Sequence, residues 1–131
     1  MRPTINKTMI FGCGNLIMGD DGYGPAVIEY LQSAYDLPVG LEAVDAGTCV
    51  REYLFDYLLT DEGRPQTIVI IDAVDFPGRQ PGEVFEILPG EIPAKKIHDF
   101  SLHQFPTVNL LQELADHTGI KVLIIAAQIQ F

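Results

Sequence analysis

The chain has no tryptophan, only two cysteines and few basic residues. Eight Lys and Arg residues stand against 18 Asp and Glu residues, which gives a formal net charge of −10 at pH 7. Binding to nucleic acid or to anionic lipid relies on clustered Lys and Arg, so this balance argues against both kinds of partner. Cys13 and Cys49 are too few for a disulfide framework, and a reducing cytoplasm is therefore the expected compartment.

Long hydrophobic runs are also missing. No apolar stretch approaches the ~20 residues that a transmembrane helix requires, and the run at 9–11 is too short for the core of a signal peptide. Hydrophobic residues nevertheless make up 47% of the 131 positions, which is ample for a hydrophobic core and argues against disorder. We therefore expect one soluble domain that spans residues 1–131.

Short apolar runs alternate with longer amphipathic stretches along the chain. The apolar runs predict buried strands at 8–11, 41–44, 67–71 and 121–126. An alternating polar and apolar segment predicts a hairpin-like edge strand at 83–88. Helical spacing predicts helices at 22–34, 50–59 and 106–117. This order predicts an α/β fold of three layers, with a central, mostly parallel twisted sheet, one antiparallel edge strand and helices on both faces.

A glycine-rich turn follows the first predicted strand. Gly12 and Gly14 suggest a dinucleotide-binding turn, but the third glycine of that fingerprint would fall on Ile17. The adjacent carboxylates of Asp20 and Asp21 would also repel a pyrophosphate. The alternative is a turn whose glycines only pack the strand against the following helix, which leaves the acidic pair unexplained.

Carboxylates and one imidazole are expected at a common rim of the sheet. One of Asp20 and Asp21 could cap the following helix, although a cap needs only one of them. Asp72, with Asp75 nearby, directly follows the central hydrophobic run and so lies at the carboxyl end of the sheet, where open α/β sheets bind ligands. His103 precedes a helix in a loop expected on the same side. Each of these residues alone is more often structural, but Asp21, Asp72 and His103 together could bind a borderline divalent metal.

Other reactive side chains are weaker candidates. His98 lies in a loop expected to be exposed, and His117 lies at a helix C-terminus, where a cation is favoured by the helix dipole. Ser101 stands too close to a histidine in the sequence to form a convincing catalytic dyad. A lowered thiol pKa is possible for Cys13 and Cys49, but both are more simply interpreted as small buried residues without a base partner.

Four blocks of sequence resemble the NiFe-hydrogenase maturation endopeptidases. In chain order they read GCGNLIMGDDGYGPAVIEYL, VDAGT, VIIDAVDFPGRQPGEVFEI and SLHQFPT. The LHQFP form looks most like the branch that acts on deazaflavin-reducing hydrogenases. The resemblance implies an α/β sandwich fold and an endopeptidase activity that removes the C-terminal extension of a hydrogenase large-subunit precursor after nickel insertion.

The resemblance also implies a site and a cofactor. Asp21, Asp72 and His103 match the family's catalytic, metal-contacting triad, although some members carry Glu at the first position. The implied metal is nickel supplied by the substrate, for which cadmium or zinc could substitute in a crystal. The implied partner is the large-subunit precursor, with no nucleic acid and no membrane, while the oligomeric state stays open.

The resemblance further concerns the glycines and the end of the chain. Gly12, Gly14 and Gly47 match family positions where the backbone passes close to the cleft. Family members continue beyond the last strand into a C-terminal helix that this sequence lacks, so the resemblance implies a domain that is truncated at its C-terminus.

The sequence leaves the mechanism and two alternative functions open. The metal could polarise the scissile carbonyl or lower the pKa of an attacking water, and Asp21 or Asp72 could relay a proton. One alternative is an independent metal-dependent hydrolase, such as an aminopeptidase with resident zinc. The other is a receiver-like signalling module, which needs a Lys at the carboxyl end of its last strand, whereas Lys121 stands at the beginning and His103 would have no role.

Overall fold

The computed structural model describes residues 7–14, 22–47, 49–74, 78–88 and 108–128. Apolar β-branched runs form its strands, and amphipathic segments form its helices. In chain order these elements are β1 (Thr8–Cys13), α1 (Tyr23–Ala34), β2 (Leu41–Gly47), α2 (Val50–Leu59), β3 (Thr67–Val74), β4 (Val84–Ile87), α3 (Val108–Thr118) and β5 (Lys121–Gln128).

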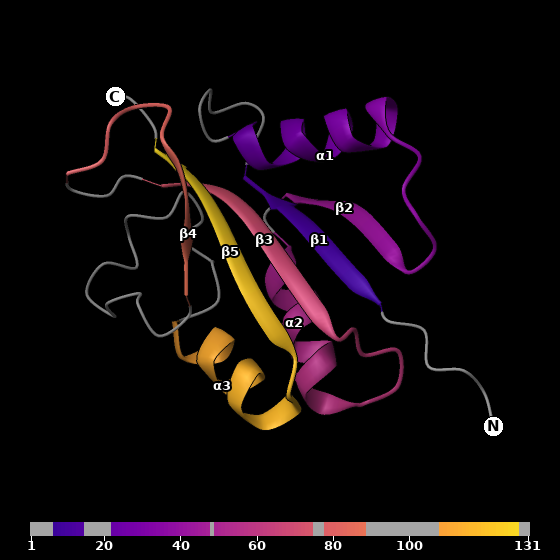
Figure 1. Cartoon of the computed structure of the whole chain (residues 1–131). Helices are drawn as coiled ribbons and strands as arrows, with labels where there is room; N and C mark the ends of the chain where they lie inside the picture. Colours follow the sequence, from indigo (N-terminus) through magenta and orange to yellow (C-terminus); the bar gives the residue numbers. More distant parts are fainter. Residues whose placement is uncertain (1–6, 15–21, 48, 75–77, 89–107, 129–131) are drawn as a thin grey trace.

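The strands form one sheet in the order β2-β1-β3-β5-β4 (Figure 1). All neighbouring pairs are parallel except β4 and β5, which are antiparallel. The prediction of a mostly parallel sheet with one antiparallel edge strand is therefore confirmed. The hairpin-like character predicted for that strand is wrong, because a hairpin would pair β4 with β3, the strand before it in the chain. Both sides of β3 are occupied by β1 and β5, and β4 pairs with the outer side of β5.

Most strands continue further than their hydrophobic runs predict. The ladder between β3 and β5 extends through Asp72↔Ala126 and Ala73↔Ala127 to Val74↔Gln128. Small and polar residues take part there because the backbone supplies the hydrogen bonds of a parallel ladder. Asp72 consequently lies inside β3, two residues before its end, and not directly after the strand as the sequence predicts.

Helices cover both faces of the sheet, as expected (Figure 1). Side chains alternate between the faces of a strand, and those of Met9, Phe11 and Cys13 pack into the core formed with α2 and α3. Gly12 faces the opposite way, toward α1, where an added Cβ would meet the α1 residue Ile28. The arrangement is the predicted three-layer α/β sandwich.

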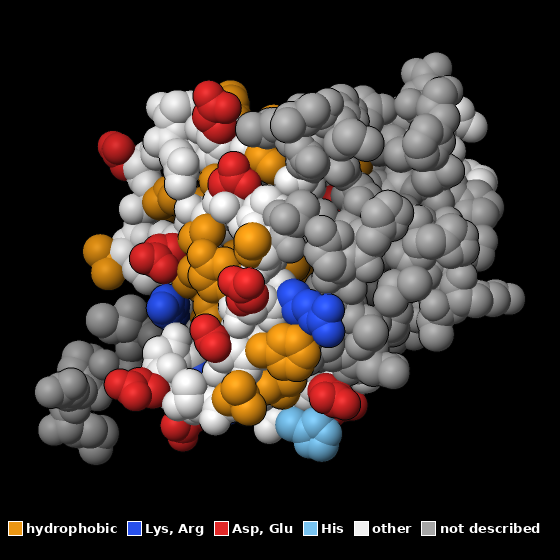
Figure 2. Space-filling view, turned by 180° about the vertical axis from the view of Figure 1, so that it is seen from behind, with side chains coloured by type: hydrophobic (Ala, Val, Ile, Leu, Met, Phe, Trp, Pro, Cys, Tyr) orange, Lys and Arg blue, Asp and Glu red, His pale blue; other side chains and the backbone are white. Residues whose placement is uncertain are grey.

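The described surface is acidic and also carries exposed apolar side chains. Figure 2 shows acidic residues spread over the described part of one face, between patches of apolar atoms. The largest exposed apolar side chains include Val39 and Leu59, which are 91% and 82% exposed. In the part of the chain that the structure describes, no helix is long and apolar enough to cross a membrane.

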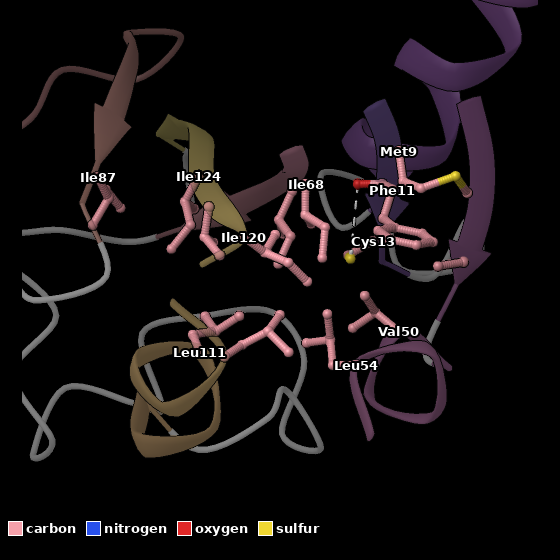
Figure 3. Close-up of a cluster of buried hydrophobic side chains, with 14 of the residues drawn as sticks. Met9, Phe11, Cys13, Val50, Leu54, Ile68, Ile87, Leu111, Ile120 and Ile124 are labelled. Atoms are coloured by element: carbon pink, nitrogen blue, oxygen red, sulfur yellow. Dashed lines mark hydrogen bonds between the residues drawn. The ribbon is translucent and has the colours of Figure 1, made fainter. Parts of the chain in front are cut away.

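The main hydrophobic core lies between the sheet and the helices α2 and α3 (Figure 3). Leu54 of α2 and Leu111 of α3 point toward strand residues such as Ile68 and Ile124, and all four are completely buried. Burying one such side chain stabilises the fold by roughly 1.5–3 kcal/mol. This packing holds β1, β3 and β5 in a fixed relation, and their carboxyl ends form the rim where the sequence predicts a site.

Candidate functional site

Asp72 is the member of the predicted triad that the structure describes. It lies on β3, between the parallel neighbours β1 and β5, and its side chain is fully buried. The backbone N–H of Ala73 donates a 2.8 Å hydrogen bond to its Oδ1. Burying a carboxylate costs free energy unless hydrogen bonds or a cation compensate. Asp72 is therefore a buried strand residue and not an exposed turn residue.

Cys13 ends β1 next to Asp72 and on the same face of the sheet as the main core. Burial raises the pKa of the Cys13 thiol well above its usual value, and the negative charges of Asp72 and Asp45 raise it further. The thiol is accordingly protonated at neutral pH, and its Sγ donates weakly to the carbonyl of Phe11 at 4.0 Å. The hypothesis of a lowered pKa is wrong for Cys13, whereas its interpretation as a small buried residue is confirmed.

Two glycines join the carboxyl ends of β1 and β2. The N–H of Gly14 donates to the carbonyl of Gly47 at 2.9 Å, and the N–H of Gly47 donates to Oδ1 of Asp45 at 3.0 Å. Gly47 has φ of +53°, a conformation that side chains with a Cβ rarely adopt. An added Cβ there would meet nothing closer than 3.9 Å, so the backbone conformation, and not crowding, requires this glycine.

Gly12 packs strand against helix. An added Cβ would come closer than 3.0 Å to Cγ1 of Ile28 and to backbone atoms of Gly24, both in α1. The hypothesis that this glycine brings the first strand close to the following helix is therefore confirmed for Gly12.

The N-cap position of α1 is occupied by a glycine. The N-cap residue is Gly22, which makes no side-chain capping bond, so neither Asp20 nor Asp21 occupies the N-cap position. Asp20 and Asp21 lie outside the described residues, so a favourable interaction of the acidic pair with the start of this helix stays a prediction.

Cys49 differs from the expectation of a small buried residue. It is exposed, because it occupies the N-cap position of α2, where the chain turns at the surface. Its N–H donates to the carbonyl of Ala46 at 2.7 Å, and its carbonyl accepts from the N–H of Glu52 at 3.1 Å. The backbone of Cys49 therefore shapes the helix start, while its thiol faces solvent.

Two further expectations concern the helix and strand ends. His117 lies in the last turn of α3, as predicted. Lys121 begins β5, and the buried Gln128 ends it, so the lysine that a receiver module needs at the carboxyl end of its last strand is absent from β5.

The remaining predicted residues lie outside the described ranges. They are Asp20, Asp21, Asp75, His98, Ser101 and His103. Among the described residues there is no group of three or more His, Cys, Asp or Glu side chains that could hold a metal ion. The triad as a set thus stays a prediction, with Asp72 placed inside β3 at the carboxyl rim.

Gly24 is a further glycine at the carboxyl rim that was not predicted from the sequence. It is buried in the first turn of α1, where an added Cβ would meet backbone atoms of Cys13 and Ile71. A signal was available, because glycine within a helix costs about 1 kcal/mol relative to alanine and often marks a close approach.

The comparisons with known proteins agree on one family. Residues 25–131 match the model of a family described as hydrogenase maturation protease. A putative hydrogenase maturation protease of Methanocaldococcus jannaschii is 38% identical over 120 residues, which cover 92% of this chain and 74% of the relative. The coenzyme F420 hydrogenase subunit delta of Methanothermobacter thermautotrophicus is 29% identical, with 92% of this chain and 75% of the relative covered.

A solved structure supports the same fold. The crystal structure of a NiFe hydrogenase maturation protease from Thermococcus kodakarensis superposes with a TM-score of 0.73 at 24% sequence identity. The superposition covers 94% of this chain and 74% of that one. The chain therefore spans about three quarters of the length of these similar proteins.

Proposed function

This chain belongs to the hydrogenase maturation protease family, and we propose that it removes the C-terminal extension of a NiFe-hydrogenase large-subunit precursor after nickel insertion. Proteins of this family are endopeptidases, which makes the chain a hydrolase. The observation that carries the proposal is the family match over 25–131, a range that includes the fully buried Asp72 at the carboxyl rim of the sheet.

The proposed site consists of Asp21, Asp72 and His103, which contact the nickel ion that the precursor carries. Two carboxylates and an imidazole suit a borderline divalent cation and leave room for ligands from the substrate. The burial of Asp72 supports this role, because a carboxylate removed from water attracts a cation more strongly than an exposed one. Nickel here is part of the substrate, and its recognition makes processing depend on nickel loading.

The residues of the chain are assigned two roles, which are to orient the scissile peptide and to transfer protons. The N–H of Ala73 holds one oxygen of Asp72, which leaves the carboxylate in a defined orientation. The substrate's nickel supplies Lewis acidity, toward either the peptide carbonyl or a water molecule. Cys13 is unsuited as a nucleophile because burial keeps its thiol protonated. The chemistry is accordingly assigned to carboxylates and not to a thiol.

The proposed partner is the nickel-loaded precursor, and the proposed compartment is the cytoplasm. Cys13 and Cys49 are both free thiols. An exposed free thiol such as Cys49 is typical of a reducing compartment, where disulfides are rare.

The test compares nickel-loaded and nickel-free precursor in a cleavage assay. We expect cleavage of the loaded precursor alone, seen as a mass loss equal to the C-terminal extension. Equal cleavage of both precursors would remove nickel recognition and leave the endopeptidase activity. Failure to cleave either precursor contradicts the proposed function. Stoichiometric zinc in the purified protein, together with cleavage of unrelated peptides, would favour an independent metallohydrolase.

Two substitutions test the site residues. Asp72→Asn and His103→Ala are expected to keep the circular dichroism spectrum of the folded chain and to lower the rate of processing at least ~10²-fold, the usual effect of losing a metal contact or a proton-transfer group. Asp116→Asn is the matched control, since Asp116 is an exposed carboxylate on α3 that accepts a hydrogen bond from Gln112. Wild-type processing rates in both site variants would refute the triad.

A further inference from the structure

The segment that leads into β4 is attached to the carboxyl rim of the sheet. The N–H of Gly82 donates to the carbonyl of Gln128 at 2.9 Å, and the N–H of Gln128 donates to the carbonyl of Glu83 at 2.8 Å. Gln128 is the last residue of β5, where it pairs with Val74, the last residue of β3. Gly82 and Glu83 are therefore held beside the carboxyl ends of two parallel strands.

Two contacts hold the guanidinium of Arg79 at the same place. Its Nη1 donates to Oε2 of Glu83 at 3.2 Å, and its Cζ lies 3.9 Å from the centroid of the Phe85 ring in β4. The Phe85 side chain packs against the main core, so it gives the guanidinium a fixed plane on which to stack. The Arg79 side chain is still 41% exposed, and its guanidinium carries further N–H donors on Nη2 and Nε.

This stack lies in the same row of the sheet as Asp72. The strands β3, β5 and β4 lie side by side (Figure 1), and Ala126 of β5 pairs with Asp72 on one side and with Phe85 on the other. Paired residues of neighbouring strands point to the same face of a sheet. The Cα atoms of Phe85 and Asp72 are two strand spacings apart, which is about 10 Å. Ala126 adds only a methyl group between them.

The stability of the fold does not account for this arrangement. An ion pair between two partly exposed side chains contributes little to stability, and Phe85 can pack against the core without a cation over its ring. The carboxylates of Asp45 in β2 and Asp72 in β3 both lie near the carboxyl ends of their strands. Arg79 therefore places a positive charge beside a negative part of the rim.

The chemistry of a guanidinium indicates what it binds. Its planar set of N–H donors matches the two oxygens of a carboxylate or a phosphate. The proposed substrate is a polypeptide, whose anionic side chains are carboxylates. An extended peptide advances about 3.3 Å per residue, so the separation of Asp72 and Phe85 corresponds to about three residues.

We propose that Arg79 is a specificity-determining residue, which binds a side-chain carboxylate of the precursor within about three residues of the scissile bond. The inference rests on the proposed function, because it assumes that the scissile bond is held at Asp72. It adds to that function a preference for an acidic residue near the bond.

The test measures binding and processing separately. Binding of the nickel-free precursor, measured by biolayer interferometry, reports contacts that do not depend on nickel. Initial rates with the nickel-loaded precursor give kcat and KM. Arg79→Gln is expected to weaken binding and to raise KM by about tenfold, the usual effect of losing hydrogen bonds to a charged group, and to keep kcat within about twofold. Unchanged binding and KM overturn the proposal.

Two further variants separate a local contact from the overall charge. Lys121→Gln is the matched control, because it removes one positive charge from an exposed residue at the opposite end of β5. It is expected to keep binding and KM within about twofold, since screening weakens an exposed charge at that distance. Arg79→Lys keeps the charge without the planar set of donors, and its KM should lie between those of the wild type and Arg79→Gln. Equal effects of Arg79→Gln and Lys121→Gln overturn the proposal.

Substitutions in the precursor identify the bound carboxylate. The mass of the released extension locates the scissile bond, and each Asp or Glu within about three residues of it is changed to the amide. One such change is expected to raise KM for the wild type and to have no effect on Arg79→Gln. Lys at that precursor position should restore binding to Arg79→Glu, an exchange that a merely structural role does not produce.

The outcomes distinguish this proposal from the proposed function. Absence of an acidic residue near the mapped bond, or absence of rescue in the folded charge-exchange pair, overturns the role of Arg79 and leaves the endopeptidase activity. Failure of the wild-type chain to process the precursor counts against the proposed function itself.

Discussion

At the scale of single residues, the two cysteines show how burial decides chemistry. Cys13 is enclosed at the end of β1, and its pKa is raised first by desolvation and then by Asp72 and Asp45. Cys49 is exposed at the start of α2. The same residue type is thus held neutral at one position and left to solvent at the other. The local sequence does not distinguish the buried cysteine from the exposed one, because both cysteines lie next to turns.

The raised pKa of Cys13 predicts a loss of stability at alkaline pH. Above about pH 9, the ordinary value for a thiol, the unfolded chain loses the Cys13 proton while the folded chain keeps it. The free energy of unfolding should therefore fall as pH rises, by up to about 1.4 kcal/mol per pH unit from this group. Urea unfolding at pH 8, 9 and 10 measures the slope in the wild type and in Cys13→Ala.

The comparison of slopes isolates the thiol. Tyr57 also has a raised pKa, mainly from burial, and it contributes equally to both proteins. In Cys13→Ala, the slope of the free energy of unfolding against pH should keep the contribution of Tyr57 and lose that of Cys13. Equal slopes in the two proteins would contradict the burial of an uncharged thiol.

At the scale of elements, α2 shows how one helix carries both core and surface. Leu54 is completely buried against the sheet and α3, while Leu59 is 82% exposed in the last turn. The two leucines lie in the same helix, and they differ only in the face of the helix that they occupy.

This difference predicts unequal effects of truncation. Leu54→Ala should lower the free energy of unfolding by about 2–5 kcal/mol, through lost burial and the cavity left behind. Leu59→Ala should change it by less than about 0.5 kcal/mol, as is usual for exposed positions. Urea denaturation followed by circular dichroism measures both. A similar loss in the two variants would mean that α2 packs by another face.

Elements were predictable where a local pattern determines them. The bounds of α2 match the prediction because its apolar residues repeat at helical spacing between two breaks. Strand ends were not predictable, since the ladder that carries β3 to Val74 depends on β5, which follows much later in the chain. The prediction for the pairing of β4 was wrong for the same reason, because strand order is a property of the whole sheet.

Of the predicted triad, the structure describes Asp72 alone. Asp72 could be found because it follows a central hydrophobic run, and a carboxylate at that place is rare enough to notice. Its full burial could not be read from the sequence, because α2, α3 and β5 all contribute to the core on its face of the sheet. Gly24 escaped notice because its role depends on the backbone of two distant strands.

At the scale of the whole molecule, acidic residues far outnumber basic ones. The net charge is −10, and the described residues contain one ion pair, between Arg79 and Glu83 at 3.2 Å, with both side chains partly exposed. Such a pair contributes little to stability. Arg79 also lies over the ring of Phe85, 3.9 Å from its centroid. Given this excess of acidic residues, we expect repulsion between them to outweigh attraction between opposite charges.

This imbalance predicts that salt stabilises the fold. Added NaCl shortens the Debye length from about 30 Å at 0.01 M to about 8 Å at 0.15 M, which screens repulsion between separated carboxylates. The midpoint of thermal unfolding should rise over this range, and most of the gain should occur below about 0.2 M, where screening changes fastest. Differential scanning calorimetry at pH 7 measures it. Arg79→Gln should show the same rise, since losing one exposed ion pair leaves the excess of negative charge. A midpoint that falls with salt would mean that ion pairs, and not repulsion, dominate the electrostatics of the folded chain.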